Sequence, residues 1–335
     1  MIGVDSHRVL LCGTQYGSVY LPAIYEDPSL DLSGILARGS ARSRRLAEQA
    51  GVELYQQVDE IHEPIDLACI AIGGEVGVEL GIAFLEKKVP VLIEHPISDQ
   101  DYLLLLQAAQ KNDSVCHING HFADLPPARD FIEAATLLSR EYRPHLINCT
   151  ANKRTLYSLL DMLMRAFGAF ELSNFTSQRI GDYTACTFLL NEIPVNLSFQ
   201  NWHGAEDDSR DAPLGHQITT IYPIGTLSLT GTYGFSSWCP LVATIPAPRA
   251  PSAVISRNLE AQVIANITSW RIEANQKAMN QLLTKADHKV SHQSAPYLKC
   301  LTSVWSDRMA QLATSVKPDI PEIVPSEYWN PFRYR

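Results

Sequence analysis

The chain has 335 residues, 46% of them hydrophobic and 19% charged, and its formal net charge at pH 7 is -9. This composition is typical of a globular protein long enough for about two domains, and it excludes disordered, collagen-like and coiled-coil architectures. The acidic balance and the lack of long runs of like charge argue against a nucleic-acid or anionic-membrane surface.

The seven cysteines are scattered along the chain and include no C-x-x-C pair. This spacing indicates reduced thiols and not a disulfide framework or a zinc knuckle. The segment before Val9 has no apolar stretch, and no later segment approaches the about 18 apolar residues that a membrane span needs. We therefore expect a cytoplasmic protein without a signal peptide or a membrane span.

Residues 1–122 are expected to form an N-terminal Rossmann domain of the α/β class. Short apolar runs alternate there with helix-patterned segments, which is typical of βαβ units on a doubly wound parallel sheet. We expect six parallel strands, and the clearest apolar runs lie at 8–12, 33–37, 66–72, 89–93 and 115–119. Helices are expected from 17 and over 43–51, 76–87 and 99–110.

Residues 123–335 have a different pattern, which predicts an α+β domain with an open, largely antiparallel sheet. Two helical stretches over 126–142 and 153–167 come first. Runs with period-two alternation follow at 183–190, 194–202, 216–222 and 226–233, and we expect them to form an antiparallel meander. A proline-rich connector over 240–251 and two helices over 256–285 and 297–315 complete the predicted domain.

The first predicted strand leads into a glycine-containing turn, in the segment Val9-Leu-Leu-Cys-Gly-Thr-Gln-Tyr-Gly17. At a strand-to-helix turn, backbone N–H groups and the helix N-terminus can bind a pyrophosphate. The G-x-G-x-x-G pattern is not intact, because Gln15 and Ser18 replace its second and third glycines. A turn without a ligand is thus one alternative. The other, which we favour, has the cofactor bound by Gly13, Thr14, Gln15 and Tyr16.

The end of the second predicted strand favours NADPH over NADH. An NAD enzyme places an acid there, about 20 residues after the glycines, to accept from the ribose hydroxyl. This chain has Arg38, Gly39 and Ser40 instead, and a guanidinium with a hydroxyl suits a phosphate. A solvated basic helix start is the alternative. Further along, Ile72 and Gly73 would let the backbone approach the cofactor.

The sequence Leu-Ile-Glu94-His95-Pro ends another strand at the carboxyl edge of the sheet, where a doubly wound fold binds its ligands. Here the chain resembles a known family. Sugar dehydrogenases of the glucose-fructose oxidoreductase type carry Glu-Lys-Pro, with the lysine as proton-transfer residue. Their relatives in siderophore biosynthesis, the thiazolinyl imine reductases, carry Glu-His-Pro, as this chain does. The glycine-poor turn and the segments 194–201 and 215–228 are also similar to the reductases.

A second comparison separates the two groups. Sugar dehydrogenases carry an Asp and a His, four residues apart, on the first long helix of the second domain, where they contact substrate hydroxyls. Aligning this helix by Asp161 and Gly168 places Arg154 and Ser158 at those positions. The resemblance therefore indicates that the sugar-oxidising site is absent. It covers most of 8–122 and, more loosely, 183–238.

The resemblance implies an NADPH-dependent reduction of a thiazoline C=N bond to a thiazolidine. The substrate would be a siderophore intermediate tethered to the peptidyl carrier domain of a nonribosomal peptide synthetase, and the enzyme would be a homodimer. Glu94 would contact the cofactor, and Asn119 and Phe122 the substrate. The reductases often have a tyrosine, proposed as an acid, where this chain has Phe122.

The predicted reaction needs a proton donor with a pKa near neutrality, because negative charge develops on the imine nitrogen as hydride adds to the carbon. Histidine meets this condition, so His95 is the first candidate and His121 the second, with water as a further possibility. A purely structural role for His95 is the alternative. We expect no metal, since His117 and His121 would lie about 13 Å apart in an extended segment.

Two other functions stay open at this point. One is a sugar or polyol oxidoreductase of the glucose-fructose oxidoreductase type. The other is a non-catalytic NADP-binding regulatory protein, because a fold does not by itself specify a function.

Overall fold

The computed structural model describes residues 6–168, 172–201, 215–241, 255–256, 262–284 and 291–312. Within these residues, no helix combines the length and the apolar character that crossing a membrane requires. The expected connector over 240–251 lies almost wholly outside the described residues, as do residues 257–261 of the helix expected over 256–285. The start of that predicted helix is wrong, because Ser256 lies in a short strand, Ile255–Ser256.

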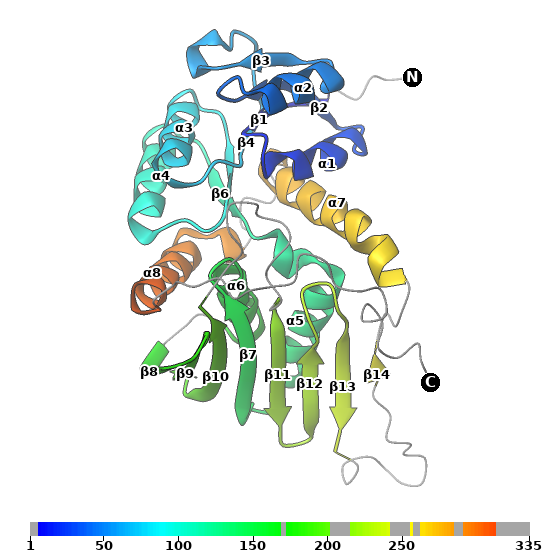
Figure 1. Ribbon diagram of the computed structural model, residues 1–335, viewed down its shortest axis with the longest axis vertical. Helices are drawn as coiled ribbons and strands as arrows, with labels where there is room; N and C mark the ends of the chain where they lie inside the picture. The colour runs from blue at the N-terminus through cyan, green and yellow to red at the C-terminus, as the bar shows by residue number, and fades with distance from the viewer. Residues whose placement is uncertain are drawn as a thin grey trace.

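A six-stranded parallel sheet in the order β3-β2-β1-β4-β5-β6 forms the first half of the molecule (Figure 1). Its strands are β1 (His7–Cys12), β2 (Leu30–Leu36), β3 (Glu53–Tyr55), β4 (Leu67–Ile70), β5 (Val91–Glu94) and β6 (Cys116–Asn119). Helices α1 (Leu21–Tyr25), α2 (Ala41–Ala50), α3 (Gly74–Glu86) and α4 (Asp99–Lys111) pack around the sheet. The predicted Rossmann fold is confirmed, and β3 is the strand whose short, partly exposed sequence gave no clear signal.

An eight-stranded mixed sheet forms the other half, in the order β14-β13-β12-β11-β7-β10-β9-β8. It contains β7 (Leu146–Asn152), β8 (Leu172–Ile180), β9 (Tyr183–Leu190), β10 (Ile193–Gln200), β11 (Gln217–Tyr222), β12 (Gly225–Leu229), β13 (Ser236–Pro240) and β14 (Ile255–Ser256). Helices α5 (Pro126–Leu138) and α6 (Leu156–Phe167) pack on this sheet (Figure 1). The predicted open, largely antiparallel sheet is confirmed.

The expected four-stranded meander is incomplete, and its strand order is wrong at one point. Strand β7, which we did not predict, lies between β10 and β11 and runs parallel to β10. In its sequence, Leu-Ile-Asn-Cys-Thr-Ala-Asn, Ile147 is the one large apolar residue at a buried position. The other buried positions hold Cys, Ala and Asn, so the hydrophobic pattern is weak. The insertion places the start of α6, which follows β7, beside the edge of the first sheet.

Two C-terminal helices return to the first half of the molecule. Helix α7 (Gln262–Leu283) packs against α1, and its Ile272, Met279 and Leu282 belong to the same apolar core as β1. Helix α8 (Ala295–Gln311) packs between α4 and α6. The two halves are thus joined by helices from the end of the chain as well as by the single link after β6 (Figure 1).

Candidate active site

The glycine turn after β1 lies at the carboxyl edge of the first sheet. Gly13 has a positive φ of 93°, and an added Cβ would lie 2.9 Å from the Ala71 carbonyl oxygen. The Gly13 N–H donates to Leu36 O at 2.9 Å, which fixes the turn between β2 and β4. Only glycine fits this position without displacing backbone. The turn continues through Thr14, Gln15 and Tyr16 into η1 (Gly17–Tyr20).

The residues predicted to bind the cofactor's phosphates are accessible at this edge. Arg38 is exposed at the end of β2 and has no ion pair with the described residues. Gly39 has a positive φ of 75°, and Ser40 caps α2 by accepting from the Ser43 N–H at 3.2 Å. Next to Ile72, exposed Gly73 leaves open space where a side chain would begin, with no atom within 4 Å of an added Cβ. These features fit an NAD(P) dinucleotide.

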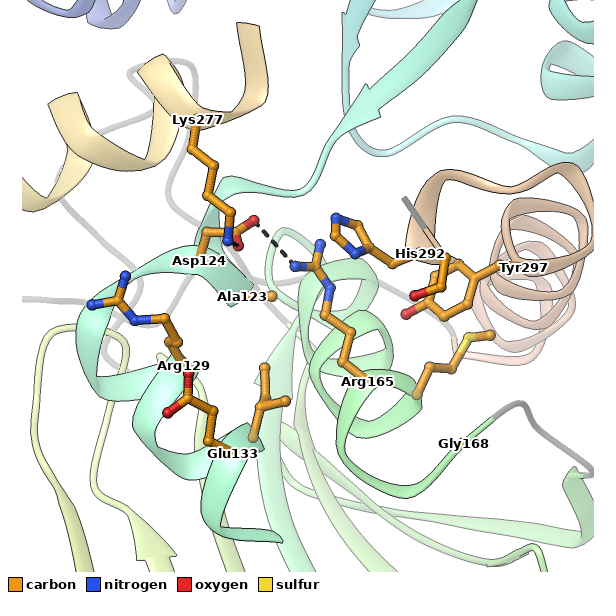
Figure 2. Close-up of a pocket in the computed structure, with 12 residues that line it drawn as sticks. Ala123, Asp124, Arg129, Glu133, Arg165, Gly168, Lys277, His292 and Tyr297 are labelled. Atoms are coloured by element: carbon orange, nitrogen blue, oxygen red, sulfur yellow. Dashed lines mark hydrogen bonds and ion pairs between the residues drawn. The ribbon is translucent and has the colours of Figure 1, made fainter. Parts of the chain in front are cut away.

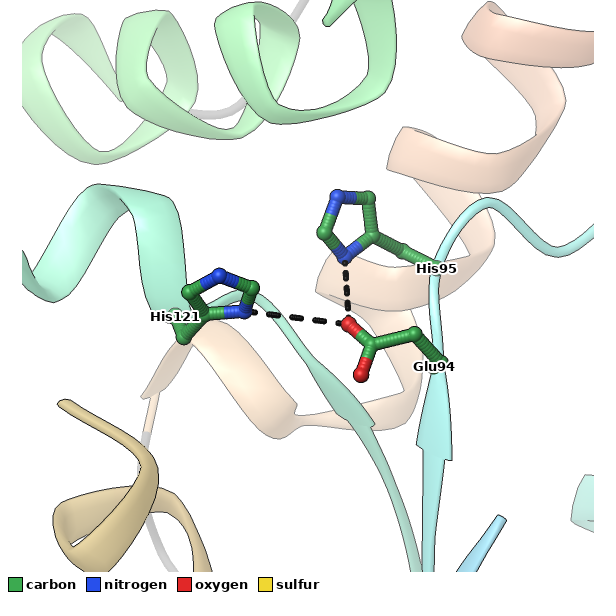
Figure 3. A group of neighbouring side chains, drawn as sticks. All are labelled: Glu94, His95 and His121. Carbon is green, nitrogen blue, oxygen red and sulfur yellow. Dashed lines mark ion pairs between the residues drawn. The ribbon is translucent and has the colours of Figure 1, made fainter. Parts of the chain in front are cut away.

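Glu94 is the centre of a polar network at the end of β5. Its Oε2 accepts from the Tyr20 hydroxyl at 2.6 Å and from Asn119 Nδ2 at 3.2 Å. Its Oε1 faces two imidazoles, with His95 Nδ1 at 3.4 Å and His121 Nδ1 at 3.7 Å (Figure 3). Burial alone would raise the pKa of Glu94, but the neighbouring imidazoles of His95 and His121 outweigh burial and lower it. Glu94 is therefore a carboxylate at neutral pH.

His95 has one defined tautomer. Its Nδ1 lies 2.6 Å from the Asn119 carbonyl oxygen, which can only accept, so Nδ1 carries a hydrogen and Nε2 is the nitrogen left to exchange a proton. Burial lowers the pKa of His95, but the adjacent Glu94 carboxylate and the bond to the Asn119 carbonyl raise it above its ordinary value. This arrangement suits an imidazolium that gives up a proton at Nε2.

His121 has a different electrostatic environment although it faces the same carboxylate. Its side chain is fully buried, and burial lowers its pKa to about 4 against the opposing effect of Glu94. Its Nε2 lies 3.4 Å from the Tyr16 hydroxyl. At neutral pH His121 is uncharged, which makes His95 the better placed of the two predicted proton donors.

The structure does not join His117 to His121 as a metal pair; it places His121 with Glu94 and His95 instead. Ligand atoms of these three residues lie within 4.8 Å of one another, the one such group among the described residues. However, the nitrogen that His95 directs toward the group is the Nδ1 that donates to the Asn119 carbonyl. A protonated nitrogen cannot coordinate a metal, so the geometry favours a hydrogen-bonded network.

Aromatic rings enclose His95 on the side of the second domain. Tyr157, from α6, stacks on His95 with 5.3 Å between ring centroids, and Phe122 meets His95 edge-on at 5.6 Å. Phe122 also packs against His216, at 5.3 Å. His216 hydrogen-bonds Ser158 at 2.6 Å, and burial lowers the pKa of His216 to about 3. Ser158 and His216 are therefore bonded to each other, and His216 Nδ1 also lies 3.0 Å from the Thr232 hydroxyl.

Asn119, a predicted substrate contact, holds the Glu94 carboxylate and links it to α7. Its side chain is fully buried and donates to Glu94, to Tyr20 and to Asn275 of α7 at 3.0 Å. Tyr20, Tyr157 and Asn275 were not predicted as site residues. Tyr20 lies only four residues after Tyr16 of the predicted turn, but the contacts of Tyr157 and Asn275 depend on tertiary packing that no local pattern indicates.

A separate open cavity of about 490 Å³ lies between α5, α6, α7 and the start of α8 (Figure 2). Its charged groups neutralise one another, since Asp124 pairs with Arg165 at 3.1 Å and with Lys277 at 2.6 Å. None of Glu94, His95 and His121 lines it. This cavity is therefore separate from the polar network at the edge of the first sheet.

Comparisons with known proteins identify both halves of the chain. Residues 7–120 match an oxidoreductase family described by its NAD-binding Rossmann fold. Residues 142–239 match the C-terminal domain of thiazolinyl imine reductases similar to Irp3. No curated protein is similar to the whole sequence at a significant level.

Solved structures share the fold across nearly the full chain. A dehydrogenase from Chromobacterium violaceum has 14% identity and a TM-score of 0.71, covering 92% of this chain and 96% of its own. A levoglucosan dehydrogenase bound to NADH and levoglucosan has 12% identity and a TM-score of 0.69, covering 92% and 97%. The 3-ketoreductase KijD10 from Actinomadura kijaniata, bound to TDP-benzene and NADP, has 14% identity and a TM-score of 0.68, covering 93% and 99%.

These structural likenesses establish the fold, and the two sequence matches establish the domains. The chain is an NAD(P)-dependent oxidoreductase that joins a Rossmann domain of the GFO/IDH/MocA family to a C-terminal domain of the Irp3-like thiazolinyl imine reductases.

Proposed function

We propose that this protein is an NADPH-dependent thiazolinyl imine reductase, which reduces the C=N bond of a thiazoline to give a thiazolidine. The observation that carries the proposal is His95, whose Nδ1 is fixed on the Asn119 carbonyl 2.6 Å away and whose charge is favoured by Glu94. A sugar dehydrogenase needs a base to remove a hydroxyl proton. An imine reductase needs an acid, and a histidinium beside a carboxylate is a suitable one.

The chain's own residues supply the proton and its control. Bound NADPH supplies the hydride. His95 donates the Nε2 proton to the imine nitrogen, so that negative charge does not accumulate there. Glu94 raises the pKa of His95 and so favours its protonated form. Tyr20 and Asn119 in turn hold the Glu94 carboxylate in place from its other oxygen.

The surroundings of His95 favour a flat, weakly polar substrate over a polyol. Tyr157 and Phe122 present rings to His95, and Ser158 and His216 are hydrogen-bonded to each other. A polyol would need several free donors and acceptors to replace its hydration, whereas these groups present mainly ring faces and leave the Tyr157 hydroxyl as the unpartnered polar group. This observation supports a thiazoline substrate over the sugar or polyol alternative.

The remaining parts of the proposal concern the cofactor and the partners. The exposed Arg38 guanidinium and the Ser40 hydroxyl support NADPH through its 2′-phosphate. The Irp3-like domain supports a substrate carried on the peptidyl carrier domain of a nonribosomal peptide synthetase in siderophore assembly. We also propose a homodimer that pairs through the second sheet, where β10 has alternating exposed positions.

A direct assay tests the proposal. The protein is incubated with NADPH and a 2-aryl-thiazoline, free or loaded on a carrier domain, and thiazolidine formation is followed by mass spectrometry. We expect a product heavier by two hydrogens, formed in equal amount to the NADPH consumed. Reduction of NADP⁺ by common sugars, with no turnover of any thiazoline, would contradict the proposal.

A further inference from the structure

Helix α7 brings an arginine to the carboxyl edge of the first sheet. Arg271 lies one turn before Asn275, whose side-chain oxygen accepts from Asn119 at 3.0 Å, at the end of β6. Asn275 Nδ2 donates back to the Arg271 carbonyl at 2.9 Å. The next residue, Ile272, is buried in the core of the Rossmann domain. The backbone of Arg271 is therefore fixed against the site (α7, Figure 1).

The side chain of Arg271 reaches the glycine turn. It lies close to the Tyr16 hydroxyl, whose pKa the guanidinium lowers against the larger effect of burial, and this hydroxyl lies 3.4 Å from His121 Nε2. The Arg271 charge is thus placed beside the turn that we propose to bind the cofactor and beside the network of Glu94.

Arg271 has no carboxylate partner among the described residues, and its Nε is buried without a hydrogen-bond acceptor. Its neighbours on α7 differ in this respect. Glu273 pairs with Arg129 at 3.2 Å, and Lys277 pairs with Asp124 at 2.6 Å. Glu273, the acidic residue nearest to Arg271 on this helix, therefore pairs with another cation.

A buried guanidinium N–H without an acceptor is unfavourable, and oxygen atoms of a phosphate or carboxylate are its strongest partners. Arginine is also suited to such groups because its donors form a planar fork. Arg271 lies beside Tyr16 with its Nε lacking an acceptor, and an anion that bound at the same edge would supply one.

We propose that Arg271 is a ligand-binding residue that takes an anionic group, a phosphate or a carboxylate, beside Tyr16. The group belongs either to the dinucleotide or to the acyl substrate, and this choice of two sources rests on the proposed function. Arg271 would then link the second part of the chain to ligand binding at the first sheet.

The test compares Arg271→Met and Arg271→Lys with Arg129→Met, which removes an exposed cation of α5. One arm measures the Kd of NADP⁺. The other measures the KM of a 2-aryl-thiazoline-4-carboxylate and of its carboxamide. If the dinucleotide supplies the anion, Arg271→Met raises the Kd of NADP⁺ about tenfold or more. If the substrate supplies it, the KM of the carboxylate rises by a similar factor and that of the carboxamide does not.

The variants also separate a binding role from a folding defect. Arg271→Lys keeps a cation and should restore part of the lost affinity, and Arg129→Met should match the wild-type protein in both arms. Values within twofold of wild type for Arg271→Met in both arms would overturn the inference while leaving the reductase assignment intact. A wild-type protein that binds NADP⁺ but reduces no thiazoline would overturn the assignment, and the dinucleotide arm would still decide the role of Arg271.

Discussion

Two histidines that share one carboxylate have opposite electrostatic roles at the site. His95 and His121 both face Glu94 Oε1, at 3.4 and 3.7 Å, yet the pKa of His95 is raised and that of His121 is lowered. The difference follows from their other neighbours. His95 also donates to a carbonyl, whereas His121 is fully buried near the Arg271 charge. One imidazole can therefore be charged while the other stays neutral, which is favourable because two adjacent cations would repel.

The first prediction concerns the proton donor. His95→Ala should lower single-turnover reduction about 100-fold or more, because general acid catalysis typically contributes 10²- to 10⁴-fold, and it should leave NADPH affinity nearly unchanged. His121→Ala should have a smaller effect. In the wild-type protein the rate should fall as pH rises through the pKa of His95, since only the protonated ring can donate.

Rates measured across pH 6 to 8 for both variants and the pair distinguish the possible donors. If only the double variant reaches a loss of about 100-fold, His121 or water shares the role. Wild-type rates in all three variants would end the assignment of a histidine acid and indicate that the thiazoline is protonated before it binds.

The second prediction concerns cofactor choice at Arg38. This guanidinium is exposed and has no ion pair with the described residues, so it is available to the 2′-phosphate of NADPH. Arg38→Asp should weaken NADPH binding by about 2 to 3 kcal/mol and reverse the preference over NADH, because it removes a charge-assisted bond and adds a repelling carboxylate. Isothermal titration with both cofactors measures the change, with exposed Arg45→Asp as the matched control. Equal affinity of the wild-type protein for NADPH and NADH would refute the role of Arg38.

At the scale of helices and strands, the sequence predicts an element where its hydrophobic pattern is strong. The run at β1 and the alternation at β9 predict those strands within one residue of their ends. Strand β8 was missed because it is mostly exposed and carries Ser, Asn, Thr and Gln, so it has no apolar face to detect.

The residues of the site were likewise predicted only where the signal is local in sequence. The motif around Glu94 is local, whereas the Tyr20 and Asn119 bonds to it join residues 74 and 25 positions away.

A buried ion cluster connects the elements behind the site. Arg165 of α6 pairs with Asp161 at 2.8 Å and with Asp124 of η3 (His121–Asp124) at 3.1 Å. Tyr297 of α8 donates to Asp161 at 2.7 Å. The loop before His121 packs so closely on this cluster that a Cβ at Gly120 would lie 2.8 Å from Asp161 Oδ2. The cluster therefore fixes the turn that carries His121 and Phe122.

The third prediction follows from this cluster. Arg165→Met should lower the free energy of unfolding by about 3 to 5 kcal/mol, because it leaves buried carboxylates without their main partner. Arg129→Met, which removes a cation from a more exposed pair with Glu273, should change it by about 1 kcal/mol or less. Urea denaturation at pH 7 measures both. Similar small losses in the two variants would show that Lys277 alone can compensate Asp124.

At the scale of the whole molecule, three histidines whose pKa values are lowered make folding sensitive to acid. Burial lowers the pKa of His121 to about 4, that of His216 to about 3 and that of His292 to about 4, each from an ordinary value of 6.5. They lie in the Rossmann edge, the second sheet and the segment before α8, so protonation would affect all parts that meet at the site. Among the histidines that the structure describes, His95 has a raised pKa and acts in the opposite direction.

The last prediction gives the sign and size of this effect. Between pH 6.5 and about 4, the unfolded chain binds protons at these three histidines that the folded chain does not, so stability must fall as pH falls. From pH 7 to pH 5 each histidine can cost up to about 2 kcal/mol, and His95 offsets part of the sum. Urea denaturation at constant ionic strength should therefore show a loss of several kcal/mol over this range. His216→Gln should make the loss smaller, because glutamine can bond Ser158 without titrating, whereas replacement of the exposed His62 by Gln should not change it. A stability that is constant from pH 7 to pH 5 in the wild-type protein would contradict this prediction. It would show that the folded state binds protons at these histidines as readily as the unfolded chain does.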